Sequence, residues 1–258
     1  MSTWLDLSRS VVENHEKISF AANPAIIQRV LKAVNKAITH VWSKEDWTFK
    51  LREVAEFVYN ASGSNTLPGD FLSFQGVGFV TLLNPDKTPK RELEYVPLGR
   101  MLRLLKDPGR QYGDPEVYSL GGSGNGGENQ RSLYVYPIPR NEVTLYLAYQ
   151  GIAPRGIQTT LPDGSPWVDP VTEDDPVVGE NQFAWTEEIP CIPGNWHESV
   201  VEEVAILFRM MDKSADITGQ SAIVGTALGE MRRDEPHGRE NAPIMVPAYG
   251  WRMNVRYS

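Results

Sequence analysis

The sequence predicts an α+β protein: a discontinuous helical bundle, built from both ends of the chain, with an inserted β-rich domain and an extended C-terminal tail. Amphipathic helical patterns occupy the residues before 44 and again those after 195. Between them, glycines and prolines separate short runs of β-branched and aromatic residues, a pattern typical of a sandwich or barrel of strands. Prolines after residue 235 then prevent a continuous helix to the C-terminus.

The expected domain boundaries follow from these changes of pattern. The helical domain has a first part at residues 1–60 and a second part at 191–235, the β-rich domain covers 61–190, and the tail covers 236–258. A chain of 258 residues can bury a sizeable core, as one large domain or two small ones.

The first two helices are predicted by apolar residues that share one helix face. Trp4, Leu7 and Val11 place a short helix within residues 3–14. A longer helix is expected at about 24–43, where apolar residues recur every three or four positions. An asparagine that can cap this helix and a proline suited to its first turn mark where it begins.

Two further helices are expected near 195–212 and 215–233. The earlier one has an apolar stripe and begins with glutamates, which the helix dipole favours at that end. The later one contains Gly219, Gly225 and Gly229, and each glycine costs a helix about 1 kcal/mol relative to alanine. That cost predicts close packing of this helix against another backbone, either in the same subunit or in a neighbour.

Several strands are predicted in and just before the β-rich region. One is expected near Trp47–Leu51 and another at Val77–Leu83. Leu133–Tyr136 and Val143–Tyr149, which a proline-containing loop joins, are expected to pair as an antiparallel hairpin. Helical spacing of the apolar residues within Pro97–Lys106 indicates a short helix among the strands.

Two loop regions need their own interpretation. The stretch Gly121–Gly127 has the glycine content of a phosphate-binding loop, but no Lys-Ser/Thr follows it, so a flexible hairpin tip is expected. Residues 151–190 contain many prolines together with Trp167, Phe183 and Trp185, which need burial. This excursion is therefore expected to wrap its own domain or a neighbouring subunit.

Charge is distributed unevenly along the chain. The net charge of −8 argues against general nucleic-acid binding. Residues 156–208 contain eleven carboxylates and no Lys or Arg, whereas residues 87–110 contain seven basic residues against three acidic ones. Either these are two solvated faces, or copies of the chain stack with unlike patches together. The residues expected to carry charge in a lumen or between subunits are Glu173, Asp174, Asp175, Arg100 and Arg103.

The C-terminal residues alternate in polarity. Apolar side chains at 251, 253, 255 and 257 are separated by polar ones, which is typical of a strand with one apolar face. A terminal strand of this kind can add to a sheet edge of another chain, although it can also fold onto its own domain. The residues predicted to bind a partner are Trp251, Arg252, Met253, Val255, Arg256 and Tyr257.

The sequence predicts no enzyme, no metal site and no cofactor. His197-Glu198 begins like a zinc-peptidase helix, but Val201 stands where the second histidine belongs. The acidic residues between 169 and 175 have oxygen ligands for Ca²⁺ but lack EF-hand spacing, so a solvated loop is favoured. A single cysteine allows no internal disulfide, and no apolar run is long enough to predict a membrane span. The N-terminal residues do not have the pattern of a signal peptide. The single cysteine fits synthesis in a reducing cytoplasm.

The order of several motifs resembles that of the head-to-tail adaptor proteins of tailed bacteriophages. Trp47-Thr48-Phe49 ends the first helical region, Leu67-Pro68-Gly69-Asp70-Phe71 opens the β-rich region, and the stretch 133–139 lies near its hairpin. Two helices then follow, so that the resemblance covers about residues 1–233. The glycine loop and the acidic excursion look like elaborations of this pattern.

This resemblance implies a structural virion protein at the head–tail junction, made in the host cytoplasm. It implies a homo-oligomeric ring, a dodecamer, with the portal protein above it and a tail or nozzle protein below. Double-stranded DNA would pass through the lumen without sequence-specific binding, and the family has no catalytic residues to transfer. The alternative is a β-rich carbohydrate-binding module of a phage tail or cell-surface protein, which the tryptophans favour and the long helices do not. A glycosidase, suggested by the many carboxylates, is the third interpretation.

Overall fold

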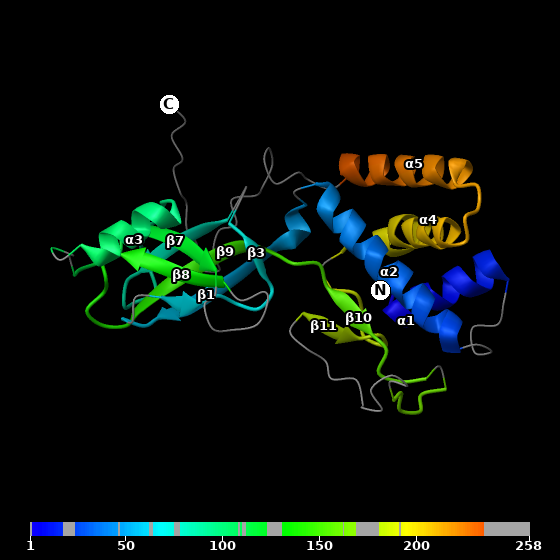
Figure 1. The fold of residues 1–258 in the computed structure, drawn as a ribbon, viewed down its shortest axis with the longest axis horizontal. Coiled ribbons are helices and arrows are strands. Elements are labelled where there is room, and N and C mark those ends of the chain that lie inside the picture. Colours follow the sequence, from blue (N-terminus) through cyan, green and yellow to red (C-terminus); the bar gives the residue numbers. More distant parts are fainter. Residues whose placement is uncertain are drawn as a thin grey trace. The chain divides into compact units, whose positions relative to one another are not determined.

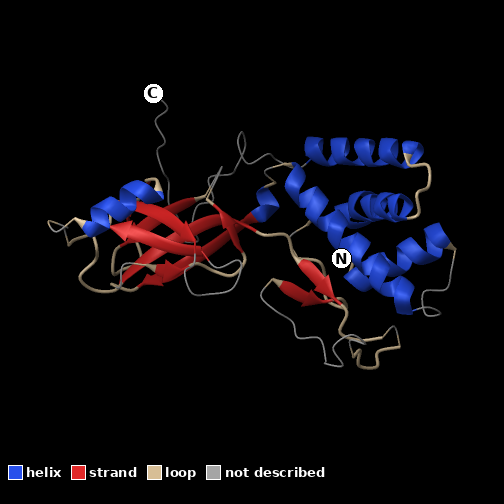
Figure 2. Ribbon diagram, viewed as in Figure 1, coloured by secondary structure: helices blue, strands red, loops and turns tan. Residues whose placement is uncertain are grey.

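The structure is a computed structural model of the chain. It describes residues 2–17, 24–45, 47–61, 64–74, 78–107, 109, 112–122, 131–161, 163–168, 181–190 and 192–234. The fold class is α+β, as predicted (Figures 1 and 2). The chain divides into two compact units, which we call the helical unit (residues 1–50 and 153–258) and the sheet unit (residues 51–152).

The helices expected near both ends of the chain are confirmed and lie in the helical unit. The elements of this unit are α1 (Trp4–Ser10), the π-helix η1 (Val11–Glu16), α2 (Pro24–Lys44), the 3-10 helix η3 (Thr48–Lys50), β10 (Arg155–Ile157), β11 (Gln182–Ala184), the π-helix η4 (His197–Glu202), α4 (Glu203–Asp212) and α5 (Thr218–Asp234). A capping box begins α1, because the Thr3 hydroxyl accepts from the Asp6 N–H while the Asp6 carboxylate accepts from the Thr3 N–H.

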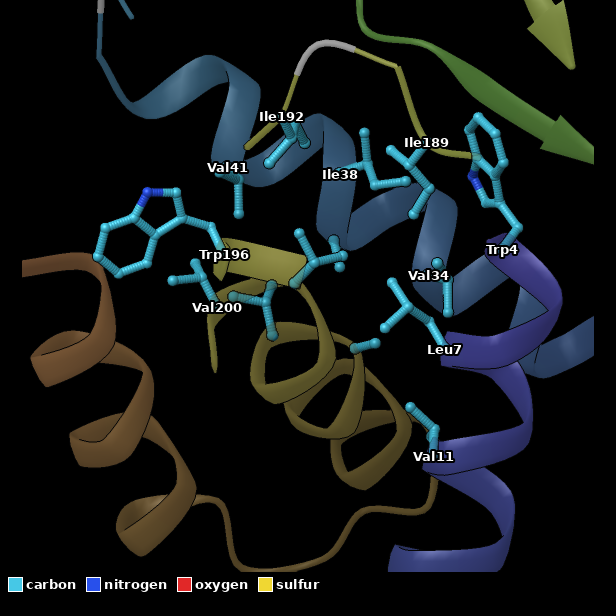
Figure 3. Packing of buried hydrophobic residues seen from close by; sticks show 14 of the residues in the cluster. Trp4, Leu7, Val11, Val34, Ile38, Val41, Ile189, Ile192, Trp196 and Val200 are labelled. Carbon is cyan, nitrogen blue, oxygen red and sulfur yellow. The ribbon is translucent and has the colours of Figure 1, made fainter. Parts of the chain in front are cut away.

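Helix α2 forms the centre of the helical unit. Its buried face includes Val34, Ile38 and Val41, none of which is exposed, and it contacts α1, η4 and α4. Figure 3 shows these side chains pointing toward Leu7 from α1 and Val200 from η4. Fully burying side chains of this size contributes roughly 1.5–3 kcal/mol each, so the apolar stripe seen in the sequence supplies much of the stability of this unit.

The described residues of the sheet unit form two sheets and one helix. Its elements are β1 (Leu51–Tyr59), β2 (Asn65–Thr66), β3 (Phe71–Ser73), β4 (Phe79–Leu83), β5 (Pro89–Glu92), β6 (Glu94–Tyr95), α3 (Leu98–Lys106), β7 (Val117–Gly122), β8 (Arg131–Tyr136) and β9 (Val143–Gly151). One sheet has the strand order β1-β9-β4-β5, with β3 also on β9, and the other has the order β2-β8-β7-β6. Side chains of both sheets form one core, for example Leu147 of β9 and Val135 of β8.

The predicted hairpin of β8 and β9 is wrong. Strand β8 pairs with β7 and β2, whereas β9 pairs with β1, β4 and β3 in the other sheet. The loop between them therefore crosses from one sheet to the other. Strand β9 is nine residues long and buried at its last seven positions, so it takes the central position of its sheet, with neighbours on both sides.

The strand predicted near Trp47–Leu51 is also wrong in its first part. Residues Thr48–Lys50 form the 3-10 helix η3, and the strand β1 begins only at Leu51. The reason is the packing of the two aromatic rings: Phe49 stacks on Trp47 at 5.7 Å between ring centroids and meets Trp42 edge-on at 5.5 Å. The Trp47 indole N–H donates to the Val41 carbonyl at 2.7 Å, which holds this turn against the end of α2.

The unit boundaries differ from the expected domain boundaries in two places. Strand β1 lies within the sheet unit, and residues 153–190 lie within the helical unit. The described parts of the excursion, residues 153–161, 163–168 and 181–190, thus belong to their own subunit, one of the two outcomes expected for it, while residues 169–180 lie outside the described residues. Trp185 is fully buried in the helical core, and Phe183 stacks on Trp4 at 5.7 Å.

A close backbone approach holds the excursion to the helices. The Asn35 side chain on α2 donates to the Gly156 carbonyl at 2.8 Å and accepts from the Gly156 N–H at 2.9 Å. A Cβ atom at Gly156 would lie 2.4 Å from Cγ of Trp4, far inside van der Waals contact. This position on β10 therefore has room only for glycine.

The glycines of α5 do not pack closely against any part of the subunit that the structure describes. A Cβ atom at Gly219, Gly225 or Gly229 would meet nothing within 4 Å, and all three residues are exposed. Of the two expectations for this helix, only packing against a neighbouring subunit stays a prediction. The glycine stretch 121–127 begins at the end of β7, and β7 is antiparallel to β8, as the expected hairpin requires. Residues 123–130 of that loop lie outside the described residues.

Candidate interaction surfaces

Helix α3 carries exposed positive charge. Met101 is fully buried and anchors the helix, which contacts β7 and β8. We define the basic face of α3 as Arg100, Arg103 and Lys106, which recur every three residues and are all exposed. Leu102 is 39% exposed beside them, and an open pocket of about 400 Å³ is lined by Leu102, Arg103, Lys106 and Asp107.

The other basic residues before α3 are neutralised within the sheet unit. Lys87 pairs with Glu56 at 2.5 Å, Arg91 pairs with Glu116 at 2.5 Å, and Lys90 pairs with Asp114. Exposed pairs of this kind contribute about 0–1 kcal/mol each, but they do cancel charge locally. The residues of the basic face have no such ion pair with any residue that the structure describes. Among the described residues of 87–110, the unpaired positive charge is therefore concentrated on α3.

The structure places only part of the predicted interaction residues. Arg100 and Arg103 lie on the basic face of α3, and the three-residue spacing adds Lys106 to them. The remaining ones lie outside the described residues and stay predictions: Glu173, Asp174, Asp175, Trp251, Arg252, Met253, Val255, Arg256 and Tyr257.

Most tryptophans are part of the helical core. Trp4, Trp42, Trp47, Trp185 and Trp196 are between 0 and 7% exposed. A platform for stacking sugars needs an open aromatic face, which these side chains do not offer. Because the tryptophans were the motive for the carbohydrate-binding alternative, their burial argues against it.

His197 stabilises the fold through hydrogen bonds of its buried side chain. It is fully buried, its Nδ1 accepts from the Ser2 N–H at 3.2 Å, and its Nε2–H donates to the Ile192 carbonyl at 2.9 Å. Burial lowers the pKa of this imidazole, so the neutral form is favoured. Both ring nitrogens are thus occupied, which agrees with rejecting the zinc-peptidase motif. In the described part of the chain, no group of three or more His, Cys, Asp or Glu side chains is arranged to hold a metal ion.

Glu202 connects η4 to the first helix. Its Oε1 accepts from the Ser10 hydroxyl at 2.6 Å. Burial raises the pKa of Glu202, and the nearby carboxylates Glu203 and Glu198 raise it further, while the Ser10 hydrogen bond opposes the shift. Together with His197, it adds a polar contact between the two ends of the chain.

The comparisons with known proteins add no assignment. No family model matches the sequence, and no curated protein matches it significantly. No helix within the described ranges is both long and apolar enough to cross a membrane. The function must therefore be argued from the residues and the fold.

Proposed function

We propose that this chain is a structural virion protein, a head-to-tail adaptor of a tailed bacteriophage. Copies of it form a homo-oligomeric ring, a dodecamer, beneath the portal protein. The ring joins the portal to a tail or nozzle protein at the head–tail junction, and double-stranded DNA passes through its lumen without sequence-specific contacts. The chain is made in the host cytoplasm and performs no catalysis.

The observation that carries the proposal is the way the two ends of the chain combine. Buried side chains from α1 and α2 share one core with those from η4, α4 and α5, while residues 51–152 form a separate compact unit. The same order of helices and β-rich region underlies the resemblance to the adaptor family. A subunit with two such units offers different surfaces to different neighbours, and a repeated heterologous contact closes into a ring.

Charge and the tail supply further support. A net charge of −8 disfavours retention of DNA, because phosphates are repelled and few counterions are released. Residues 251–257 are proposed to dock on another chain, since four apolar side chains on one face of a strand are unfavourable in water.

The test is the assembly state of the full chain. Native mass spectrometry and negative-stain microscopy of the chain alone, over a range of concentrations, should show rings whose mass is a multiple of 28.9 kDa. Mixing with the portal protein of the same virion should give a larger complex. Deleting residues 242–258 should leave a folded subunit that no longer assembles with its partners. A chain that stays monomeric under every condition and binds no portal protein contradicts the proposal. Binding to a glycan array by that monomer would favour the carbohydrate-binding alternative.

A further inference from the structure

We propose that the basic face of α3 binds the acidic segment 169–180 of a second copy of this chain. The contact would join neighbouring subunits, so it rests on the proposed ring, which supplies the second copy. The proposal concerns one patch of three side chains and one twelve-residue segment, and it names the pairing that orients each subunit toward the next.

The first step is the positive charge on the sheet unit that its own carboxylates do not neutralise. Among the described residues of 87–110, the ion pairs of Lys87, Lys90 and Arg91 neutralise the cations that lie outside α3, with acids of the same unit. Arg100, Arg103 and Lys106 remain on two successive turns of a helix that Met101 fixes to the sheet. Their spacing puts them on one face, where they act as a single cationic surface.

The second step is the chemistry of the occupant. Segment 169–180 contains no Lys or Arg, and its five carboxylates are Asp169, Glu173, Asp174, Asp175 and Glu180. Several other acids of the 156–208 stretch have partners in their own unit: Asp163 accepts from Ser165, Glu202 from Ser10 and Glu203 from Gln220. The segment is thus the densest run of carboxylates in the chain, and guanidinium groups bind carboxylates in bidentate geometry.

The third step is apolar complementarity. The pocket beside the basic face is lined in part by Leu102, which is 39% exposed. The acidic segment carries valines at 171, 177 and 178, on both sides of its central acids. A partner that combines carboxylates with small apolar side chains fits this surface better than DNA does, because DNA offers phosphates but no aliphatic groups.

Charge exchange tests the contact. The variants R100E/R103E and D174K/D175K should each weaken self-association of the full chain about tenfold or more, because each places like charges together. An equal mixture of the two variants should restore association, as should a single chain that carries all four substitutions. R131E/R140E is the matched control, since it changes the net charge of the sheet unit equally at two exposed positions outside α3. Its association should equal that of the native chain.

Cross-linking then separates contacts between copies from contacts within one chain. Native chain and nitrogen-15-labelled chain are mixed and treated with a zero-length carbodiimide, which joins lysines to carboxylates. Lys106 should be joined to segment 169–180 in products of mixed isotope. Lys90, which pairs with Asp114 of its own chain, should give products of one isotope only.

The outcomes distinguish this contact from the proposed function. Rings that form normally with R100E/R103E, or Lys106 products of one isotope only, overturn the docking contact and leave the ring intact. Weaker DNA binding by the R100E/R103E ring than by the native ring, with association unchanged, would assign the basic face to DNA instead. Absence of any ring or portal complex from the native chain would contradict the proposed function itself.

Discussion

In the helical unit, buried side chains that share one core come from positions as distant as Trp4 and Met231, whereas every core residue of the sheet unit lies within residues 51–152. The helical unit also buries polar contacts between the chain ends, such as Ser2 with His197. The sheet unit carries several surface ion pairs, such as that of Lys87 with Glu56. Buried contacts between the two ends of the chain stabilise the first unit, and pairing among strands that all come from residues 51–152 stabilises the second.

The largest expected effect is from glycine replacement in the helical unit. Gly156→Ala should destabilise the helical unit by about 1–3 kcal/mol or more, because the new methyl group collides with the buried Trp4 ring. Gly121→Ala in the sheet unit also meets a ring, that of Tyr134, at 2.5 Å. Tyr134 is only half-buried and can rotate away, so Gly121→Ala should lower the unfolding free energy by less than Gly156→Ala does. Urea unfolding of both variants measures the difference, and equal costs would contradict the comparison.

The next effect concerns the hydrogen bonds that hold the excursion. Asn35→Ala removes two contacts to the partly buried backbone of Gly156, which should cost about 1–3 kcal/mol. Thr39→Ala, one turn further along α2 at an exposed site, is the matched control and should change the unfolding free energy by less than about 0.5 kcal/mol. Hydrogen exchange should show the loss of protection at residues 155–157. Unchanged protection there would show that Asn35 does not hold the excursion.

The pH dependence should also separate the units. The pKa of His197 is lowered by burial, so the unfolded chain binds its proton first as the pH falls below about 6.5. The unfolding free energy of the helical unit is therefore highest above that pH. Below it, the free energy falls by up to about 1.4 kcal/mol per pH unit for each histidine that the unfolded chain protonates first. His40, whose pKa is lowered by burial and by Lys44, acts in the same direction.

Urea unfolding at pH 7.5 and 5.5 checks this dependence. His197→Gln should make the helical unit less sensitive to this change of pH. Glu202 acts in the opposite sense at lower pH, because its raised pKa makes the folded state bind the proton first. A pH dependence equal in the native and His197→Gln chains would contradict the role given to this imidazole.

The smallest effect is expected on α5. Gly225→Ala should stabilise the isolated subunit by about 0.5–1 kcal/mol, because the position is helical and open. Gly225→Leu should leave the isolated subunit folded but prevent assembly, if a neighbouring backbone packs there. Thermal unfolding and native mass spectrometry of the two variants test this. Assembly unchanged by the leucine would remove the last explanation for three glycines in one helix.

Local sequence patterns predicted the helices, but they could not predict which segments pack or pair with each other. The spacing of Val34, Ile38 and Val41 shows a helix because neighbours three and four residues apart share a face. The separation of β8 and β9 into two sheets depends on strands distant in sequence, which no local pattern records. Trp47 and Phe49 have strand-like spacing, yet their rings pack together beside Trp42, so tertiary packing overrode the alternation.

The candidate surface was predictable in charge but not in detail. The excess of basic residues pointed to Arg100 and Arg103. Which cations remain unpaired depends on strand register, because β5 places Arg91 near Glu116 at the start of β7 only when the sheets are formed. The close approach of Gly156 to Trp4 had no signal in the sequence, since one glycine among many looks like any loop residue.

The division of the helical unit between the two ends of the chain affects its biosynthesis. Helix α2 leaves the ribosome long before η4 and α4, whose side chains cover its apolar face. The sheet unit is complete once residue 152 has emerged, so it can fold during translation, before the segments that cover α2 have been synthesised. A chain that terminates early thus has an uncovered apolar helix, a substrate for chaperones and proteases. Only finished chains then mature into subunits that can enter an assembly.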